Sequence, residues 1–439
     1  MPLGGGSFTL QNKVLPGAYH NFVSAKNAAT AGSRGVASLP LVLNWGADET
    51  IIRIDAGDFY RDALNVFGYY ADAEELFLIR EALKRANTLL CYKVNQGGAK
   101  ATATVGGLTA TAKYTGTRGN DLLVAVVENP DGGFDVVTYL DREEIERQTV
   151  ATADDVKSND FIDFEKSDDL TAAVGTELTG GTNGEASGAN YTKYLATIEA
   201  EEFNVLGYPG DDSDTRALFI AFVKRLRDDE GYKITGVISG SAADHEGIIN
   251  VKNGVVLEDG RTVTPVEAVA WVTGATAGAE INESLTNTIY DGAVDAYPKY
   301  TKGQYEAAVK AGEFCFYSEA GKARVVTDIN SLTTFTSAKN SDWTSNRLVR
   351  VIDAWSNDSA RIFGESYLGV ETNDDIGRQL YKADLVSLGN QYQEIRALQN
   401  FSAYDIEIKQ GNGKRDVYVV AAIQPTDAME KLYMVTHVA

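Results

Sequence analysis

The stretch FNVLGYPGDDSDTRALFIAFVKRLRDDEGYKITGVIS at residues 203–239 decides the fold of this chain. Its first five residues form an apolar run typical of a buried strand, residues 214–229 show the spacing of a helix, and residues 232–239 predict a second buried strand. A sequence that alternates strands with helices builds a mainly parallel sheet whose two faces are covered by helices. We therefore expect an α/β core domain over residues 189–345.

A second, smaller α/β domain is expected upstream, over residues 29–97. One of its helices is expected to begin with Asp72 and Glu75 at the spacing of a capping box, followed by apolar residues on one face. The elements expected in this domain are strands at 39–45, 49–54 and 88–94 and helices at 58–67 and 72–86.

The composition changes after Gly97 to an alternation of Thr, Ala and Gly, which predicts a β-rich, sandwich-like domain over residues 98–188. Residues 121–128 and 134–140 flank the sequence Asn-Pro-Asp-Gly-Gly, and this arrangement predicts a hairpin. The glycine-rich end of the region, residues 180–188, has the composition of a flexible linker.

Two later helices are marked by their first residues. Thr264 and Glu267 form a capping box around Pro265, which favours the first position of a helix. Thr301 and Gln304 repeat the capping-box spacing before a second, shorter helix. An α+β C-terminal domain then follows over 346–430, with helical patterns first and strand patterns at 404–409 and 416–423 last.

The two ends of the chain have extended, apolar patterns. Residues 432–438 alternate like a strand within a final segment, 431–439, and residues 16–23 belong to an N-terminal arm over 1–28. Terminal residues are usually disordered unless a partner holds them, and an unpaired apolar strand promotes aggregation. Two arrangements satisfy the C-terminal pattern: a local hairpin with 416–423 of the same chain, or donation to a neighbouring subunit.

Composition excludes some partners. The formal net charge of -22 and the pI near 4.6 would repel a phosphate backbone, so we expect no direct nucleic-acid partner. The sequence contains no run of about 18 apolar residues that would predict membrane insertion. The first residues also lack a signal-peptide pattern, so synthesis in the cytoplasm is expected. Cys91 and Cys315 lie in apolar runs, where a free thiol behaves as a small buried hydrophobe.

Five segments carry a resemblance that extends over nearly the whole chain. They are Pro-Gly-Ala-Tyr at 16–19, Leu-Val-Leu-Asn-Trp-Gly at 41–46, the helix region 268–278, Gly-Arg-Gln-Leu-Tyr-Lys-Ala-Asp at 377–384, and Pro-Thr-Asp-Ala-Met-Glu-Lys-Leu-Tyr-Met at 425–434. This pattern resembles the tail sheath proteins of contractile bacteriophages, above all the compact sheaths of Gram-positive myophages and defective prophage particles. The resemblance is weakest over 99–188.

The resemblance implies a structural protein of a virion or phage-tail-like particle. Six subunits would form a ring, and rings would stack helically around a tail tube and contract to drive that tube through a bacterial envelope. The partners so implied are other copies of the chain, the tube protein, and the baseplate and tail terminator proteins. No cofactor is implied, and the core domain is expected to have a subtilisin-like fold.

The resemblance also favours strand exchange over the local hairpin and implies roles for particular residues. The N-terminal arm would donate Tyr19, Phe22 and Val23 to a neighbour. The donated C-terminal strand would contribute Leu432, Tyr433, Met434, Val435 and Val438. The receiving strands would present Ile406, Ile408, Val417, Val419, Ala421 and Ile423. A contact with the tube would involve Asp374, Asp375, Arg378 and Lys382.

A subtilisin-like core requires a check for Ser-His-Asp chemistry. The chain has three histidines, and the sequence around His245, Ser-Ala-Ala-Asp-His-Glu-Gly, contains no nucleophile elbow, so a solvated loop histidine is expected. The carboxylates at Asp211, Asp212 and Asp214 precede a helix and fit its N-terminal cap better than a cation site. We therefore predict no catalytic residues, no metal site and no cofactor.

Two functions from other classes remain open at this point. An α/β hydrolase-like enzyme with β-rich appendages would need a pocket with a perturbed histidine or carboxylate. A non-contractile shell or filament protein could use the same exchanged strands.

Overall fold

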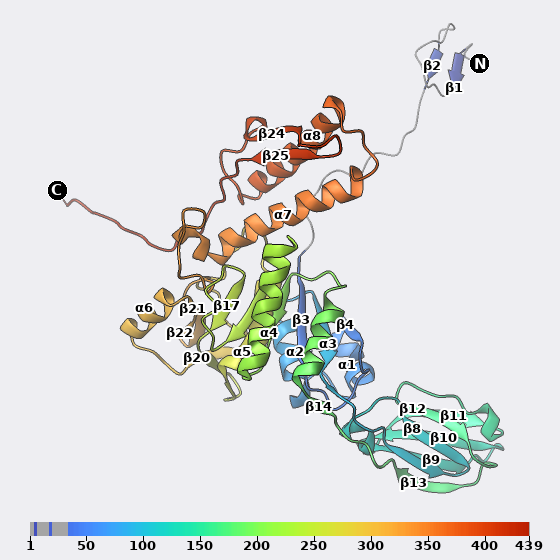
Figure 1. Ribbon diagram of the computed structural model, residues 1–439. Coiled ribbons are helices and arrows are strands. Elements are labelled where there is room, and N and C mark those ends of the chain that lie inside the picture. Colours follow the sequence, from blue (N-terminus) through green and yellow to red (C-terminus); the bar gives the residue numbers. More distant parts are fainter. Residues whose placement is uncertain (1–3, 7–16, 20–33, 439) are drawn as a thin grey trace. The chain divides into compact units, whose positions relative to one another are not determined.

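The computed structural model describes residues 4–6, 17–19 and 34–438 (Figure 1). It divides into two compact units. The central unit consists of Ser33–Asn357 and Pro425–Ala439, and the C-terminal unit consists of Met1–Gly32 and Asp358–Gln424. No helix among the described residues has the length and apolar character that a membrane span requires.

A seven-stranded sheet organises the central unit. Its order is β21-β17-β16-β15-β3-β5-β4, and every neighbouring pair is parallel except β4 with β5. The mainly parallel sheet is therefore confirmed. Its strands are β3 (Val36–Leu41), β4 (Ile51–Asp55), β5 (Thr88–Lys93), β15 (Val205–Gly207), β16 (Thr235–Ser239), β17 (Ile248–Val251) and β21 (Glu313–Phe314).

The expectation of a separate small α/β domain over 29–97 is wrong, because its strands belong to this sheet. Val205 and Leu206 of β15 pair with Ala37 and Ser38 of β3, so residues from both expected domains form one continuous layer. The boundary was misplaced because the β-rich insertion separates the two halves of the sheet in the sequence but not in space.

Helices cover both faces of the sheet, and alternate strand residues point to each (Figure 1). Leu89 and Cys91 of β5 join the core beneath one set of helices, whereas Leu90 and Tyr92 join the core beneath the other. The first set is α1 (Phe59–Phe67), α2 (Phe77–Leu83) and α5 (Pro265–Gly278), and the second is α3 (Gly188–Ile198) and α4 (Ser213–Lys224). Cys91 and Cys315 are both buried and free, as expected.

Capping explains where several helices begin. Thr264 and Glu267 form the predicted capping box of α5, and Thr301 and Gln304 form that of α6 (Lys302–Lys310). The expected helix at 72–86 is different: a 3-10 turn at Glu74–Leu76 precedes α2, and Asp72 caps neither element. α4 continues through a π-helical turn, Arg225–Asp229. Other 3-10 turns are Thr117–Asp121, Ala153–Asp155, Ser341–Thr344 and Ala403–Asp405.

The predicted β-rich region forms two facing sheets. One has the order β11-β10-β9-β13 and the other β12-β8-β7. The predicted hairpin is confirmed, since Phe134 pairs with Glu128 across the turn. The strands are β7 (Thr102–Val105), β8 (Leu108–Ala112), β9 (Leu122–Glu128), β10 (Phe134–Leu140), β11 (Glu143–Val150), β12 (Ile162–Lys166) and β13 (Ala173–Glu177).

The expected flexible linker at 180–188 is wrong. Within it, β14 (Glu185–Ala186) pairs with β6 (Asn95–Gln96), where the chain leaves the central sheet. The backbone of Thr182 also exchanges hydrogen bonds of 3.1 Å with that of Ala99. Glycine is required here because two backbone segments lie close together: a Cβ on Gly184 would lie 1.9 Å from the Gln96 carbonyl oxygen.

Smaller sheets complete the two units. In the central unit β18 (Gly254–Leu257) pairs with β19 (Thr262–Val263) and β20 (Ala293–Tyr297), and β22 (Phe316–Glu319) forms a hairpin with β23 (Lys322–Val325). Helix α7 (Asn346–Ser366) passes from the central into the C-terminal unit. The C-terminal unit then contains α8 (Asp375–Glu394), β24 (Ile406–Gln410) and β25 (Val417–Ala421).

The packing of α5 on α2 depends on two glycines one helical turn apart. A Cβ on Gly274 would lie 2.0 Å from the carbonyl oxygen of Ala82, and a Cβ on Gly278 would lie 1.9 Å from that of Arg85. The two helices therefore approach more closely than any larger residue allows.

We predict that Gly274→Ala destabilises the central unit by about 1–3 kcal/mol or more, because backbone atoms of α2 cannot move aside as a side chain could. Gly303→Ala in α6 is the matched control, since a Cβ there meets no atom within 4 Å and alanine favours a helix. Thermal unfolding of both variants checks this prediction. Equal melting temperatures would show that the helices tolerate separation.

Candidate assembly interface

The C-terminal unit contains an antiparallel two-stranded sheet whose outer edges pair with no other strand in the described part of the chain. Ile406 of β24 pairs with Ala421 of β25, and Gln410 pairs with Val417. Among the described residues, no further strand joins either β24 or β25.

The register shows which backbone groups point outward. The Gly411 N–H donates to the Asp416 carbonyl at 2.8 Å, and the Ala422 N–H donates to the Asp405 carbonyl at 2.9 Å, at opposite ends of the ladder. In an antiparallel pair, hydrogen-bonded and non-hydrogen-bonded residue pairs alternate. Tyr418 and Val420 therefore bond to β24, and the residues between them direct their N–H and C=O groups to the open edge. These outward residues are Val417, Val419 and Ala421 on β25, and Ile406, Ile408 and Gln410 on β24.

The residues with outward backbone groups have their side chains on one face. Ile406 is fully buried, and Ile408, Val417, Val419 and Ala421 are half-buried. On the opposite face, the residues that bond within the ladder are exposed: Glu407, Lys409, Tyr418 and Val420. An added strand would thus extend a surface that is already apolar. The predicted acceptor Ile423 lies beyond the end of β25.

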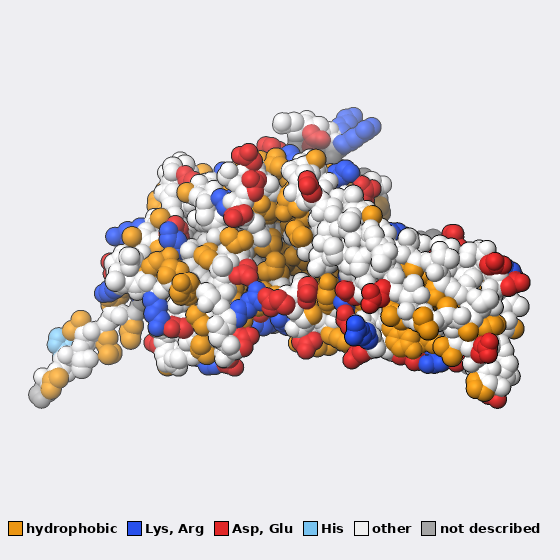
Figure 2. Space-filling view, turned by 90° about the horizontal axis from the view of Figure 1, so that it is seen from below, with side chains coloured by type: hydrophobic (Ala, Val, Ile, Leu, Met, Phe, Trp, Pro, Cys, Tyr) orange, Lys and Arg blue, Asp and Glu red, His pale blue; other side chains and the backbone are white. Residues whose placement is uncertain are grey.

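The C-terminal arm, residues 431–438, forms no strand within this chain. The expected strand at 432–438 and the local hairpin with 416–423 are both absent from the described structure, because no partner strand lies alongside. Figure 2 shows apolar side chains along the projecting segment. Their exposed fractions are Leu432 84%, Tyr433 88%, Met434 74%, Val435 81% and Val438 92%.

The N-terminal arm is described only in part. β1 (Gly4–Gly6) pairs in parallel with β2 (Gly17–Tyr19), which ends at the predicted arm residue Tyr19. The predicted arm residues Phe22 and Val23 lie outside the described residues.

The residues expected to contact a tube lie along the first turns of α8, but three of the four have structural partners. Asp374 caps the helix by accepting from the Gly377 N–H at 2.8 Å, and Arg378 bonds to the side-chain oxygen of Asn373 at 2.8 Å and to the carboxylate of Asp375. The side chain of Asp375 is 98% exposed, and Lys382 is half-buried. Sequence reasoning missed the apolar residues exposed around this helix start: Leu368, Val370, Ile376 and Leu380.

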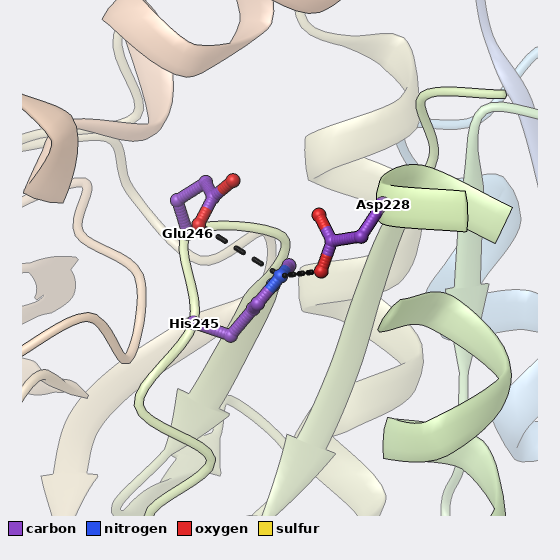
Figure 3. A group of neighbouring side chains, drawn as sticks. All are labelled: Asp228, His245 and Glu246. Carbon is purple, nitrogen blue, oxygen red and sulfur yellow. Dashed lines mark hydrogen bonds and ion pairs between the residues drawn. The ribbon is translucent and has the colours of Figure 1, made fainter. Parts of the chain in front are cut away.

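His245 is buried, so the expectation of a solvated loop histidine is wrong. Its ring lies beside Asp228, on the π-helical turn, and Glu246 (Figure 3). His245 Nε2 is 3.0 Å from Asp228 Oδ2 and 3.8 Å from Glu246 Oε2. No local pattern in the sequence signals this burial, because the loop that carries His245 and Glu246 is contacted by the distant residues Ser331 and Lys339.

These three side chains have the spacing of a metal site, but the imidazole does not fit one. The Gly247 N–H donates to His245 Nδ1 at 3.0 Å, so Nδ1 is the unprotonated nitrogen and Nε2 carries the proton that faces Asp228. A metal at Nε2 would require the opposite tautomer, with Nδ1–H donating to an acceptor. The cluster is therefore a hydrogen-bonded structural network.

The same contacts exclude His245 as the base of a Ser-His-Asp triad. Ser331 Oγ bonds to the backbone N–H and carbonyl of His245 rather than to its ring. Of the carboxylates at 211–214, Asp212 caps α4 through the Thr215 N–H at 2.7 Å, which confirms the capping interpretation.

Burial lowers the pKa of the His245 imidazole, against the opposing attraction of Glu246 and Asp228. Arg227 and Lys339 also lie in this network, through Glu246. The unfolded chain, with a histidine pKa near 6.5, binds more protons than the folded one. Stability from neutral His245 is thus present above about pH 6.5 and lost as the pH falls, because protonation of Nδ1 breaks its bond with Gly247.

We predict that His245→Asn, which retains an acceptor near the Nδ1 position, is less stable than the native chain by about 1–2 kcal/mol at pH 7.5. This difference should shrink towards pH 5.5, because asparagine does not titrate. Urea unfolding at several pH values provides the measurement, with the exposed His437→Asn as control. A difference that is constant with pH would contradict the assignment.

Family comparisons cover almost the entire chain. Models of four phage tail sheath regions match it in order: the domain III N-terminal region of tail sheath protein Gp18 at residues 34–94, the β-sandwich domain at 96–183, the central domain at 184–331 and the C-terminal domain at 338–439. The phage-like element PBSX protein XkdK of Bacillus subtilis strain 168 is 36% identical over 464 residues, which cover 98% of this chain and 99% of the relative.

Solved structures agree with these matches. The crystal structure of a sheath tail protein from Desulfitobacterium hafniense is 43% identical, with a TM-score of 0.85 over 95% of this chain and 99% of that one. A sheath tail protein from Listeria innocua is 35% identical, with a TM-score of 0.81 over 93% and 95% of the two chains. The contracted helical sheath of the anti-feeding prophage is 11% identical, with a TM-score of 0.60 over 97% and 99%, and shares the fold. The chain belongs to the phage tail sheath protein family, whose members are structural proteins rather than enzymes.

Proposed function

We propose that this sheath subunit polymerises as stacked hexameric rings around a tail tube and contracts to drive the tube through a bacterial envelope. One observation supports it most: among the described residues, the outer edges of β24 and β25 pair with no other strand, and the exposed apolar arm has no partner strand. Strand addition would satisfy both features at once, since main-chain hydrogen bonds provide attachment and alternate side chains provide register.

The arm of one subunit adds to an open edge of the small sheet of another. If it joins β25, its backbone bonds to Val417, Val419 and Ala421, whose N–H and C=O groups point outward. Leu432 and Met434 share one face of an extended arm and would continue the apolar surface of β25, whereas Tyr433 and Val435 would lie beside the exposed Tyr418 and Val420. The second open edge, on β24, leaves room for the N-terminal arm.

No single arm has to be strong. A backbone hydrogen bond contributes only about 0.5–1.5 kcal/mol net, and each ordered residue loses about 1–2 kcal/mol of conformational entropy. Each subunit would donate two arms and receive two arms, so it would bind several neighbours simultaneously. Once the first arm has docked, each further contact forms within the same complex and is effectively intramolecular. Such a mesh can remain joined while individual subunits rotate.

The start of α8 is the element we assign to the tube protein. Lys382 and the exposed carboxylate of Asp375, which also pairs with Arg378, supply charge there, and Ile376 and Leu380 add exposed apolar surface. A mixed contact of this kind is weak for each subunit and partly screened by salt. Baseplate and tail terminator proteins would contact the end rings, and assembly would take place in the host cytoplasm, consistent with a component of a virion or phage-tail-like particle.

We expect deletion of residues 431–439 to give a folded monomer that cannot polymerise, because the exposed arm stabilises a neighbour rather than its own chain. Sedimentation and thermal unfolding measure the two effects. Tubes formed by the truncated chain, or a melting temperature far below that of the full-length monomer, would refute exchange.

A matched pair of proline substitutions tests the receiving edge. Val419→Pro removes an outward N–H and is tolerated on an edge strand, so this variant should fold but fail to assemble. Val420→Pro removes an N–H that bonds to β24, and should instead unfold the small sheet. Circular dichroism and electron microscopy separate the two outcomes. Normal assembly of Val419→Pro would exclude the β25 edge as acceptor.

A further inference from the structure

The segment that leads into the C-terminal arm is fastened to the central unit of its own chain. We call Pro425–Glu430 the arm root. Thr286 Oγ1 donates to Glu430 Oε1 at 2.6 Å, and Thr327 Oγ1 donates to Glu430 Oε2 at 3.1 Å. Both oxygens of this carboxylate are therefore held, by residues from two separate segments.

The hydroxyl of Thr286 is oriented by a hydrogen bond that does not involve Glu430. Its oxygen accepts a 2.8 Å hydrogen bond from the Asp328 N–H, so its own proton is directed elsewhere, towards the carboxylate. Asp328 is almost fully buried and is itself fixed, because its carboxylate accepts from the Leu285 N–H at 3.0 Å and from Asn346 Nδ2 at 2.8 Å. The receptor for Glu430 is thus built on a rigid network at the start of α7.

A second contact holds the beginning of the arm root. Arg347 Nη2 donates to Thr426 Oγ1 at 3.1 Å, and Arg347 Nη1 lies 3.9 Å from the Asp427 carboxylate. Arg347 is buried and also donates from Nε to the Asn282 carbonyl at 2.6 Å. Its guanidinium therefore connects α7, the 282–288 loop and the arm root.

Beyond Glu430 the side chains lose these contacts. Pro425, Thr426 and Ala428 are half-buried, whereas every residue from Met429 to Val438 is exposed. Glu430 is thus the last anchored position.

We propose that the arm root is a latch that fixes the C-terminal arm to the central unit, and that the exchangeable part of the arm begins at Lys431. This inference rests on the proposed exchange function. The latch restricts the reach of the arm, since residues 431–438 span at most about 26–29 Å when extended. The receiving sheet of a second copy must therefore come within that distance of Glu430. Latching also favours exchange, because the arm leaves from one fixed point and loses less freedom on docking.

The test measures where the arm lies in the unassembled protein. Spin labels at Lys302→Cys, on the exposed side of α6, and at Lys431→Cys report the distance between the central unit and the start of the free arm. The two native cysteines are buried and should not label. We expect one narrow distance distribution in the full-length chain and at least a twofold broader one in Glu430→Ala and in Thr327→Val. Thr327→Val leaves the Thr286–Asp328 bond intact.

Met429→Ala is the matched control, because this neighbouring side chain is exposed and should leave the distribution unchanged. The unlabelled latch variants should polymerise at least fivefold more slowly than the native chain, with unchanged melting temperatures. Unbroadened distributions in both latch variants would overturn the latch, and broadening with a native rate of polymerisation would overturn its positioning role. Failure of the exchange proposal would appear in a different experiment, because the chain that lacks residues 431–439 would then still assemble. That outcome would leave the spin-label distances in the monomer unchanged.

Discussion

The alternation of hydrogen-bonded and free backbone groups in β25 is the constraint on which the assembly argument depends. In the central sheet, β3 and β5 are paired on both sides and covered by helices on both faces. In the small sheet each strand has one partner strand among the described residues, so Val417, Val419 and Ala421 direct their N–H and C=O groups to the outer edge, where another strand could pair with them. The same residues turn apolar side chains towards the covered face. An edge of this kind is a template for pairing with another strand.

Local signals in the sequence predicted local structure well. The capping boxes at Thr264 and Thr301 and the turn before Phe134 each place an element correctly, because a few adjacent residues determine the hydrogen bonds involved. The family resemblance came from short segments distributed along the whole chain. The outward residues of β24 and β25 also coincide with most of the predicted acceptors. In a strand of an antiparallel pair, the direction of the side chains and the direction of the backbone N–H and C=O groups both alternate from one residue to the next, so apolar residues at every second position share one outward set.

Features that depend on distant contacts were not predictable. Nothing near Ala37 indicates that its strand pairs with Val205, so a continuous sheet was interpreted as two domains. The glycines at 180–188 have the composition of a linker, but they permit close backbone approach to residues 95–99. His245 looks solvated in the sequence and is buried by Ser331 and Lys339. The latch on Glu430 uses two threonines far upstream, and a single exposed glutamate gives no sign of such partners.

The position of the latch determines how force passes through an exchanged lattice. The chain passes from the central into the C-terminal unit within α7 and returns after Gln424, where the arm root contacts the central unit before the free arm begins. The receiving edges, in contrast, belong to the C-terminal unit. Each exchanged C-terminal strand would therefore join the central unit of one subunit to the C-terminal unit of another. In the central unit, apolar cores cover both faces of the seven-stranded sheet, and a buried Arg227–Asp353 ion pair connects the π-helical turn to α7. Rotation during contraction would then fall on Lys431, the first residue beyond the latch, where the exposed side chains of the arm make no buried contact that opposes it, while the paired strands remain intact.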